Sequence, residues 1–209
     1  MSGRLVGRED AIAAWRRAEA LIYPTVMVNP AIYEQYLTIV RAIADELADV
    51  RTDDDLVTAW TERRDIATAV VERHSPSMRA VMDLAAVRDA AFCHRHRELT
   101  RERGREIAAE RLEAARRAGD EWVVLFEDVT PMGSHRLEMH VRTGRALHPS
   151  SQVDFEKPTP TFELEVVQLD PSTGTWLLDQ PPLMPAQRYP THEEWEARIA
   201  QARATFGKD

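Results

Sequence analysis

The first residues whose types suggest chemistry form one short run, Cys93-His94-Arg95-His96-Arg97. Thiolate and imidazole groups bind metal ions, so the run raises the question of a metal site. The surrounding pattern is helical, and successive residues of a helix point in different directions. A regular helix therefore does not gather these side chains around one ion, and Glu98 and Thr100 add no further histidine or cysteine. We expect no metal site and no cofactor here, but a charged helix face in solvent.

A second set of polar residues lies along the same predicted helix at helical spacing. Three of them interrupt a stripe that is apolar at both ends: Val81, Ala85, Arg88, Phe92, His96, Leu99, Arg103, Ile107. If this face is packed, Arg88, His96 and Arg103 need partners, because burying an unpaired charge is costly. They would either line a pocket for an anion or an acidic substrate, or form salt bridges with the acidic helices upstream. Both interpretations stay open.

A third set lies on a predicted strand, residues 134–142, whose side chains alternate between two faces. Glu138 and His140 share one face with Arg136 and Arg142, and a carboxylate beside an imidazole is suited to general acid–base catalysis. A polar outer face of a sheet has the same pattern. Ser134 and His135 are adjacent in a strand and must diverge, so they predict no catalytic pair. His148 falls in a predicted loop that would be able to close over this face.

The glycines and the cysteine count exclude several classes of site. None of the eight glycines has the spacing of a dinucleotide fingerprint, a P-loop or a nucleophile elbow, although variant sites without these motifs are not excluded. The single cysteine, Cys93, permits no intrachain disulfide and no thiolate-rich zinc or iron–sulfur site.

Composition predicts an acidic globular protein. The chain has 209 residues, 44% of them hydrophobic, and a formal net charge of −8, which argues against a protein built around a nucleic-acid duplex. The arginines of residues 95–117 alternate with glutamates at helical pairing distance and have no aromatic residue among them, so nucleic acid is not the expected partner. Arginine outnumbers lysine 25 to 2, which is typical of a GC-rich bacterial genome. With no membrane-length apolar stretch and no apolar leader, we expect a cytoplasmic location.

Helical periodicity extends over the first 118 residues. The predicted helices cover residues 8–22, a segment that starts at Asn29-Pro30, a segment from Thr52 to His74, and a long helix from Ser75-Pro76 to Gly119. Such a helix would be about 60 Å long at ~1.5 Å per residue, so part of it must project, pair with another chain or brace the second part. Gly104 is its weakest internal position. Residues 23–30 predict a tight connection, or one wall of a ligand pocket.

Strand signals follow from Glu121 onward. A strand at residues 122–126, a turn at Pro131-Met132-Gly133 and the alternating strand 134–142 predict a hairpin. The prolines within residues 143–161 favour a long loop there, with a short strand at 152–155 as an alternative. A second hairpin is expected from residues 162–169 and 175–178, followed by an extended proline-rich connector at 181–185 and a last helix that starts in the capping box Thr191-His192-Glu193-Glu194.

These patterns predict an α+β fold, with a helical domain at residues 1–118, an antiparallel β subdomain at 119–180, and a connector and terminal helix at 181–209 that packs back. The leading functional prediction is a non-enzymatic, cytoplasmic bacterial interaction or assembly protein, adaptor-like, whose long charged helix mediates self-association as a homo-oligomer or docks a protein partner. The alternative is an enzyme or small-ligand-binding protein with a pocket between the long helix and the sheet. Its lining would be the five polar residues Arg88, His96, Arg103, Glu138 and His140.

Overall fold

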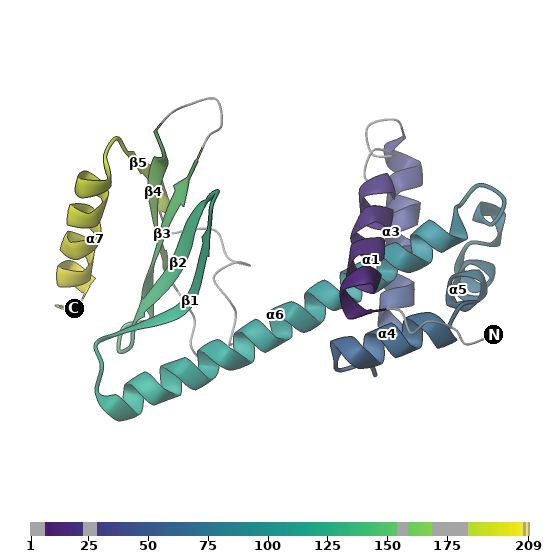
Figure 1. Cartoon of the computed structure of the whole chain (residues 1–209), viewed down its shortest axis with the longest axis horizontal. Helices are drawn as coiled ribbons and strands as arrows, with labels where there is room; N and C mark the ends of the chain where they lie inside the picture. The colour runs from purple at the N-terminus through teal and green to yellow at the C-terminus, as the bar shows by residue number, and fades with distance from the viewer. Residues whose placement is uncertain (1–6, 23–28, 154–158, 169–183, 207, 209) are drawn as a thin grey trace. The chain divides into compact units, whose positions relative to one another are not determined.

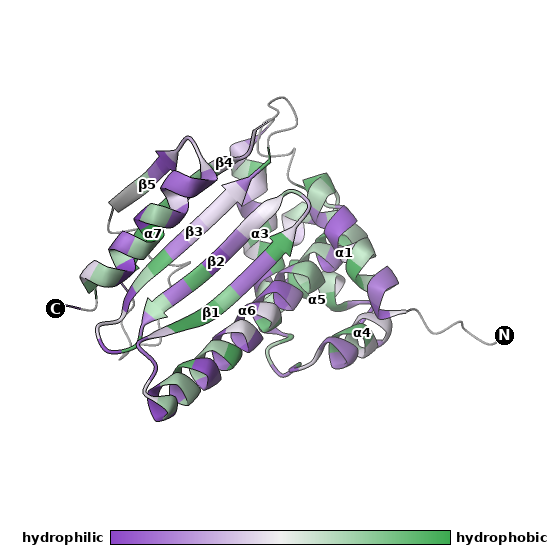
Figure 2. Ribbon diagram, turned by 60° about the vertical axis from the view of Figure 1, so that its left-hand side comes forward, coloured by the Kyte–Doolittle hydropathy of each residue, from purple (hydrophilic) through white to green (hydrophobic). Residues whose placement is uncertain are grey.

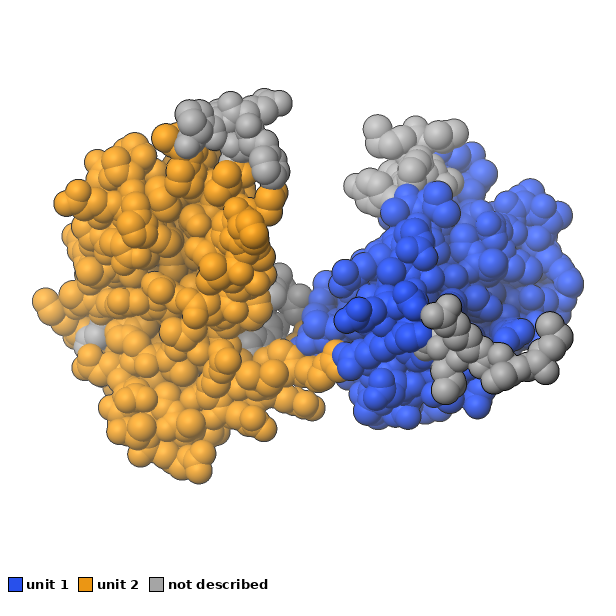
Figure 3. All heavy atoms as spheres, in the orientation of Figure 1, with its two compact units in different colours: residues 1–102 blue, residues 103–209 orange. Residues whose placement is uncertain are grey.

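The computed structural model describes residues 7–22, 29–153, 159–168, 184–206 and 208, in the element order shown in Figure 1. It divides into two compact units, unit 1 (residues 1–102) and unit 2 (residues 103–209), which Figure 3 colours separately. The division falls within the long helix α6 (Leu84–Ala118), so the two halves of this helix belong to different units. Helices, a long helix, an antiparallel sheet and a C-terminal helix together confirm the predicted α+β class.

Unit 1 is helical, and its helices begin where the capping residues predict. It contains α1 (Arg8–Ile22), α3 (Pro30–Asp45), α4 (Asp53–Glu62), α5 (Ile66–His74), the short 3₁₀ helix η1 (Pro76–Met78) and the first half of α6. Asn29 Oδ1 accepts a hydrogen bond from the Ile32 amide at 3.3 Å, and Thr52 Oγ1 accepts one from the Asp55 amide at 3.1 Å. Both side chains satisfy amides that a helix start leaves without a backbone acceptor.

The predicted continuous helix from Thr52 to His74 is wrong, because it is broken between α4 and α5. Arg63 ends α4, and its guanidinium donates to the Glu46 carbonyl oxygen at 3.0 Å and to Asp49 Oδ2 at 2.9 Å. The hydrogen bond from Arg63 also holds the pKa of Asp49 below its usual value. No local helix breaker marks this position, and the contacts of Arg63 with Glu46 and Asp49 join the end of α4 to the segment after α3.

The predicted start of the long helix is also wrong. Ser75-Pro76 begins only η1, and α6 starts after Asp83, whose Oδ1 accepts hydrogen bonds from the amides of Ala85 and Ala86 at 3.1 Å each. The helix then continues through Gly104 for 35 residues, about 52 Å at ~1.5 Å per residue.

The core of unit 1 surrounds Trp15 of α1. Its side chain is fully buried and packs against Trp60 of α4 and Phe92 of α6, with ring centroids 6.0 and 5.7 Å away. The α6 residues from Val87 to Leu99 that face this cluster are buried with it. The predicted stripe is therefore packed around Phe92 and Leu99, whereas Ile107 further along is half exposed.

Unit 2 contains a five-stranded antiparallel sheet in the order β1-β2-β3-β4-β5, so that each strand pairs with the next along the chain. The strands are β1 (Trp122–Thr130), β2 (Gly133–His140), β3 (Arg145–Gln152), β4 (Thr161–Gln168) and β5 (Met184–Tyr189). The first predicted hairpin is confirmed, with Trp122 opposite His140 and Thr130 opposite Gly133. β1 and β5 are the edges of the sheet.

Each face of the sheet is covered by a helix. On the face toward α6, which we call the α6 face, Ala108 and Leu112 of α6 pack against Leu137, Met139 and other apolar side chains. On the opposite, α7 face, Trp195 and Ile199 of α7 (His192–Phe206) pack against Leu147 and its neighbours. Within unit 2, α7 and the second half of α6 therefore lie on opposite faces of the sheet.

Residues predicted as a long loop form β3, which is a correction to the sequence reading. Pro149 lies within this strand, opposite Leu164 of β4. Pairing with β2 is interrupted between the pairs His135–Ser150 and Glu138–Leu147, because a proline has no N–H to donate to a ladder. β5, expected to be a connector, includes Pro185 and joins the sheet only at its edge, where proline is tolerated.

Other predicted segments lie outside the described residues. These are residues 23–28, the strand at 175–178 with its turn at 170–174, and the first part of the proline-rich connector. Among the described helices, none combines the length and the apolar character that crossing a bilayer requires.

The ends of the two helices of unit 2 follow their predicted signals. Gly119 has φ +76°, its amide donates to the Arg116 carbonyl oxygen, and the Asp120 amide donates to the Ala115 carbonyl oxygen. This is the Schellman arrangement, which needs a left-handed residue and so favours glycine. At the start of α7, Thr191 Oγ1 accepts from the Glu194 amide at 3.2 Å, as the capping box predicts.

Candidate functional site

The five residues predicted to line a pocket are divided between the two units. Arg88 and His96 lie in unit 1, whereas Arg103, Glu138 and His140 lie in unit 2. A pocket that all five would line stays a prediction. Within each unit, however, their contacts are defined.

In unit 1, Arg88 and His96 contact acidic partners at the rim of the Trp15 core. Arg88 Nε donates to Asp89 Oδ1 at 2.9 Å, and its guanidinium lies 5.5 Å from the centre of the Trp60 ring. Trp60 Nε1 donates to the same carboxylate oxygen at 2.8 Å. Asp89 thus binds two donors that fix the orientation of Trp60 against the core.

His96 lies within hydrogen-bond distance of Asp53, the first residue of α4. The ring Nδ1 lies 3.1 Å from Asp53 Oδ1, and Arg8 of α1 binds the other carboxylate oxygen. Asp53 is almost completely buried, so the polar contacts from Arg8 and His96 compensate for the loss of its hydration. The contact joins α1, α4 and α6. For His96, it agrees with the interpretation that the polar residues of the α6 stripe pair with acidic helices upstream.

The expectation that residues 93–97 form a solvated helix face is wrong for two of them. Arg95 is 4% exposed, and it donates to the Val50 carbonyl oxygen at 2.9 Å as well as to Glu98 and Glu102 of its own helix. Cys93 is 3% exposed, with its Sγ 3.4 Å from Glu19 Oε2. Among the described residues, no group of three or more histidine, cysteine, aspartate or glutamate side chains is placed to hold a metal ion.

The thiol of Cys93 is predicted to be unreactive in the folded protein. Burial, and secondly the Glu19 carboxylate, raise its pKa to about 11 from 9.0. At pH 8 this leaves about 100-fold less thiolate than in the unfolded chain, and burial slows access further. Labelling with a thiol-specific chromogenic reagent at pH 8, with and without urea, measures the ratio. Equal rates in both conditions would contradict this environment.

The raised pKa of Cys93 also predicts that the folded protein loses stability at high pH. Because the folded pKa is raised, the contribution of the thiol to stability is complete below about pH 9 and is lost as the pH rises toward 11. A Cys93→Ser variant should not lose this contribution to stability between pH 9 and 11, since the serine hydroxyl does not ionise in this range.

In unit 2, Glu138 and His140 lie on the α7 face and are each 2% exposed. Arg203 of α7 donates two hydrogen bonds to Glu138, from Nε to Oε2 at 2.8 Å and from Nη2 to Oε1 at 2.6 Å. Arg136 also pairs with this carboxylate. The polar outer face expected from the alternating pattern is therefore covered. α7 buries it, and arginines compensate for the buried charge.

His140 is held by the turn that follows β2. Its Nδ1 lies 2.8 Å from Thr143 Oγ1 and accepts from the Thr143 amide at 3.3 Å, while the ring packs against Trp122 at 5.3 Å. Both His140 and Glu138 thus have internal partners that stabilise the sheet and α7. Arg103 is partly buried on α6.

The strands bring together two other histidines that the sequence did not pair. His135 of β2 and His148 of β3 stack on the α6 face with ring centroids 5.9 Å apart. Glu165 of β4 lies 3.1 Å from His148 Nδ1, so its carboxylate oxygen accepts a hydrogen bond from the Nδ1–H group. This arrangement leaves Nε2 available to bind a proton, as a general base requires. Because residues 143–161 were expected to be a loop, the pairing of His148 with β2 and β4 was missed.

Exposed apolar side chains concentrate on one edge of unit 2. Of the eight large apolar side chains that the described residues expose, six belong to this unit, and we call them the β1 patch: Ile107, Val124, Phe126, Val129, Met132, Val153. The last two are joined by a hydrogen bond from the Val153 amide to the Met132 carbonyl oxygen at 2.8 Å. Figure 2 shows β1 at the sheet edge beside α6 with several apolar bands. Exposed apolar clusters of this kind mark interaction sites in many proteins.

The edge of β1 is protected only along its first half. A β-bulge lies between Val124 and Phe126, and Arg111 of α6 donates to the Leu125 carbonyl oxygen at 3.1 Å. Ile107 precedes Arg111 by four residues and so shares its helix face. Bulges and capping side chains discourage a further strand from pairing, and neither is present at residues 126–130. We call residues 126–130 the open segment.

Comparisons with known proteins add no relative. Neither protein-family models, nor curated proteins, nor solved structures produced a match to this chain.

Proposed function

We propose that this protein is a non-enzymatic interaction protein, adaptor-like and cytoplasmic in a bacterium, that docks an extended segment of a protein partner along the β1 edge. The observation that carries the proposal is the β1 patch: three of its exposed apolar side chains lie on the edge strand β1, one on α6, one in the β1–β2 turn and one directly after β3. Such a surface gains free energy when a partner removes it from water. The long helix contributes Ile107 to this surface and Arg111 as its boundary.

The charges of the open segment favour a basic partner. Glu127 and Asp128 are exposed, and no described residue forms an ion pair with either. Register with β2 places Glu127 and Val129 on the α7 face and Phe126 and Asp128 on the α6 face. Each face thus presents one acidic and one apolar side chain. A complementary strand would carry the order apolar, basic, basic, apolar, which is the same in either chain direction.

A second copy of the chain is a poorer occupant of this edge. A two-fold axis at the middle of the open segment would place Asp128 directly opposite Asp128 of the copy, and like charges directly opposite are destabilising. The net charge of −8 adds a general repulsion between copies. Self-association through this edge would appear as a concentration-dependent dimer, and the experiment below distinguishes it from docking of a peptide.

The test is a charge exchange between protein and peptide. A capped peptide with the central run Val-Lys-Arg-Val is expected to bind the whole protein in fluorescence anisotropy. Glu127→Lys with Asp128→Lys should weaken that binding about tenfold and should create binding of the Val-Glu-Asp-Val peptide. Phe126→Ser should weaken binding of both peptides, whereas Val81→Ser, which alters an exposed valine of unit 1, should change neither.

Two results would overturn the proposal. One is equal binding of the basic and acidic peptides by the unmodified protein, or binding of neither. The other is a concentration-dependent dimer in sedimentation velocity that Phe126→Ser abolishes, since this would assign the edge to a second copy of the chain.

A further inference from the structure

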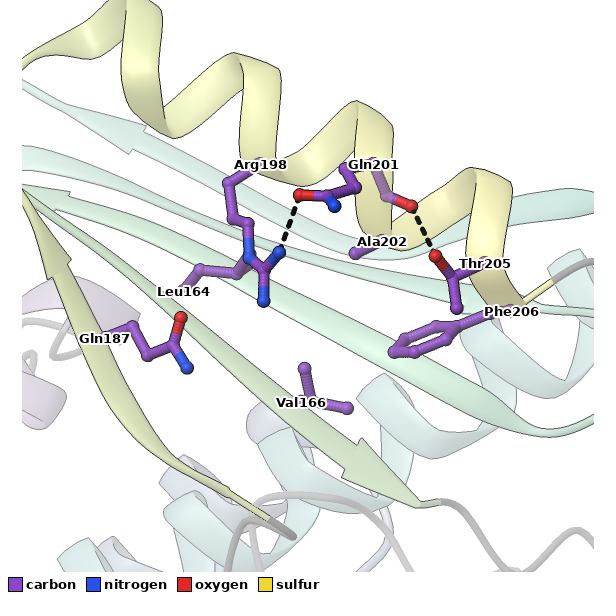
Figure 4. Close-up of a pocket in the computed structure, with 8 residues that line it drawn as sticks. All are labelled: Leu164, Val166, Gln187, Arg198, Gln201, Ala202, Thr205 and Phe206. Atoms are coloured by element: carbon purple, nitrogen blue, oxygen red, sulfur yellow. Dashed lines mark hydrogen bonds between the residues drawn. The ribbon is translucent and has the colours of Figure 1, made fainter.

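A small pocket lies between α7 and the β4–β5 edge of the sheet, away from β1. Its volume is about 100 Å³, and it is lined by residues of α7, β4 and β5 that Figure 4 labels: Leu164, Val166, Gln187, Arg198, Gln201, Ala202, Thr205, Phe206. Liquid water occupies ~30 Å³ per molecule, so the space corresponds to roughly three waters or a short branched alkyl group.

The pocket has a local structural cause. β4 and β5 pair with a register shift between Leu164 and Val166, which displaces the edge strand at this point. Above Val166, α7 presents Ala202, whose methyl group is too short to fill the space. The neighbouring turns of α7 bury Trp195 and Ile199 against the sheet, so the helix is held in place around the gap.

The pocket has an apolar side and a polar side. Leu164 and Val166 form an apolar floor with Phe206 at one end, whereas Arg198 descends from α7 over this floor (Figure 4). Gln187 of β5 lies on the opposite side, with its amide directed toward the guanidinium.

Arg198 has capacity for a further acceptor. Its Nη1 donates to Gln201 Oε1 at 2.6 Å, and this is a neutral partner. Among the described residues, no carboxylate forms an ion pair with Arg198, and a guanidinium has five N–H donors in a planar fork that matches a carboxylate.

We propose that this pocket binds an aliphatic carboxylate, with the carboxylate on Arg198 and the Gln187 amide and the alkyl group on Leu164, Val166 and Phe206. Two sources share this chemistry: a free short-chain acid, and the C-terminal residue of a peptide that ends in valine or leucine. The site is independent of the β1 edge, so it stands whether or not the proposed interaction function is correct.

The experiment is a titration of the whole protein, labelled with nitrogen-15, followed by amide chemical shifts. The probes are isovalerate for a free acid and a short capped peptide with a C-terminal valine for a chain end. Isovaleramide and the C-terminally amidated peptide are their uncharged controls. Saturable shifts confined to α7, β4 and β5, produced by a carboxylate probe but not by its amide, are expected. The tighter of the two carboxylate probes identifies the source.

Three variants separate binding from folding. Arg198→Gln is expected to weaken binding about 10- to 100-fold, because a charge-assisted pair is lost while the fold is kept. Ala202→Leu should fill the pocket and abolish binding. Arg188→Gln, which removes an exposed arginine of β5 that pairs with Glu163, should leave it unchanged. Near-UV circular dichroism checks that each variant is folded.

Binding that is identical for carboxylate and amide probes, or unaffected by Arg198→Gln in the folded variant, would overturn the assignment. So would the absence of saturable shifts with every probe up to ~20 mM, because a carboxylate that pairs with Arg198 while its alkyl group is buried should bind below that concentration.

Discussion

Gly133→Ala is expected to destabilise unit 2 by more than about 3 kcal/mol. Gly133 has φ +147°, and a Cβ built on it would lie 1.9 Å from the Ser151 carbonyl oxygen and 2.9 Å from the Ser151 carbonyl carbon. Both obstacles are backbone atoms of β3, directly beside the residue that pairs with Gly133, Gln152. Relief therefore requires separating β2 from β3 where the ladder begins, and no side-chain rotation can accommodate the methyl group.

Gly104→Ala is the matched control, because the same chemical change should have the opposite sign. A Cβ at Gly104 meets nothing within 4 Å, and the residue lies inside α6. Alanine should stabilise the helix by about 0.5–1 kcal/mol. Urea denaturation, followed by far-UV circular dichroism and tryptophan fluorescence, measures both variants. Equal midpoints for Gly133→Ala and the unmodified protein would show that β2 and β3 do not approach as described.

Arg203→Met is expected to cost about 2–3 kcal/mol, because it removes the main partner of a buried carboxylate. Glu138 keeps only Arg136 after this change, and its side chain is 2% exposed. The side chain of Arg203 is itself 39% exposed, so the expected cost lies at the lower end for a buried pair. The loss should appear in urea denaturation of unit 2, for which Trp122 and Trp195 are reporters.

The double variant Arg203→Met with Glu138→Leu distinguishes a buried charge from lost packing. Replacing both partners by apolar side chains removes the unpaired carboxylate, so most of the stability should return. Arg188→Met is the surface control: the side chain of Arg188 is 79% exposed, and its pair with Glu163 should be worth less than about 1 kcal/mol. If the double variant is no more stable than Arg203→Met, the alkyl chain of the arginine rather than its charge stabilises α7.

These contacts bear on the choice between an enzyme and an interaction protein. Four of the five residues that the sequence offered for a ligand pocket bind neighbouring side chains or turns within their own unit, as Glu138 and His140 do under α7. The groups best placed for acid–base chemistry are instead His148 and Glu165, on the other face of the sheet. The exposed apolar side chains of the β1 patch are not accounted for by these contacts, which is why docking rather than catalysis is proposed.

Features that depend on a few adjacent residues were predictable from the sequence. Asn29 and Thr52 cap helices because their side chains reach an amide three residues ahead, and Gly119 ends α6 because it adopts a positive φ without strain. The Pro131-Met132-Gly133 turn and the alternation after it predicted the first hairpin in the same way. Each of these signals acts within about five residues, where local sterics and hydrogen bonds dominate.

Features that depend on distant partners were decided only by the tertiary structure. At the break after α4, Arg63 contacts the Glu46 carbonyl and Asp49, and the strand through Pro149 pairs with β4 along its whole length. The pairing of His148 with Glu165 and the burial of Glu138 under α7 join residues 17 and 65 positions apart. A polar residue in an alternating strand has the same local pattern whether water or a helix covers it. The sequence by itself therefore determined the helix caps, the helix stop at Gly119 and the first hairpin. The packing of α6 and α7 on the two faces decided which polar side chains became structural.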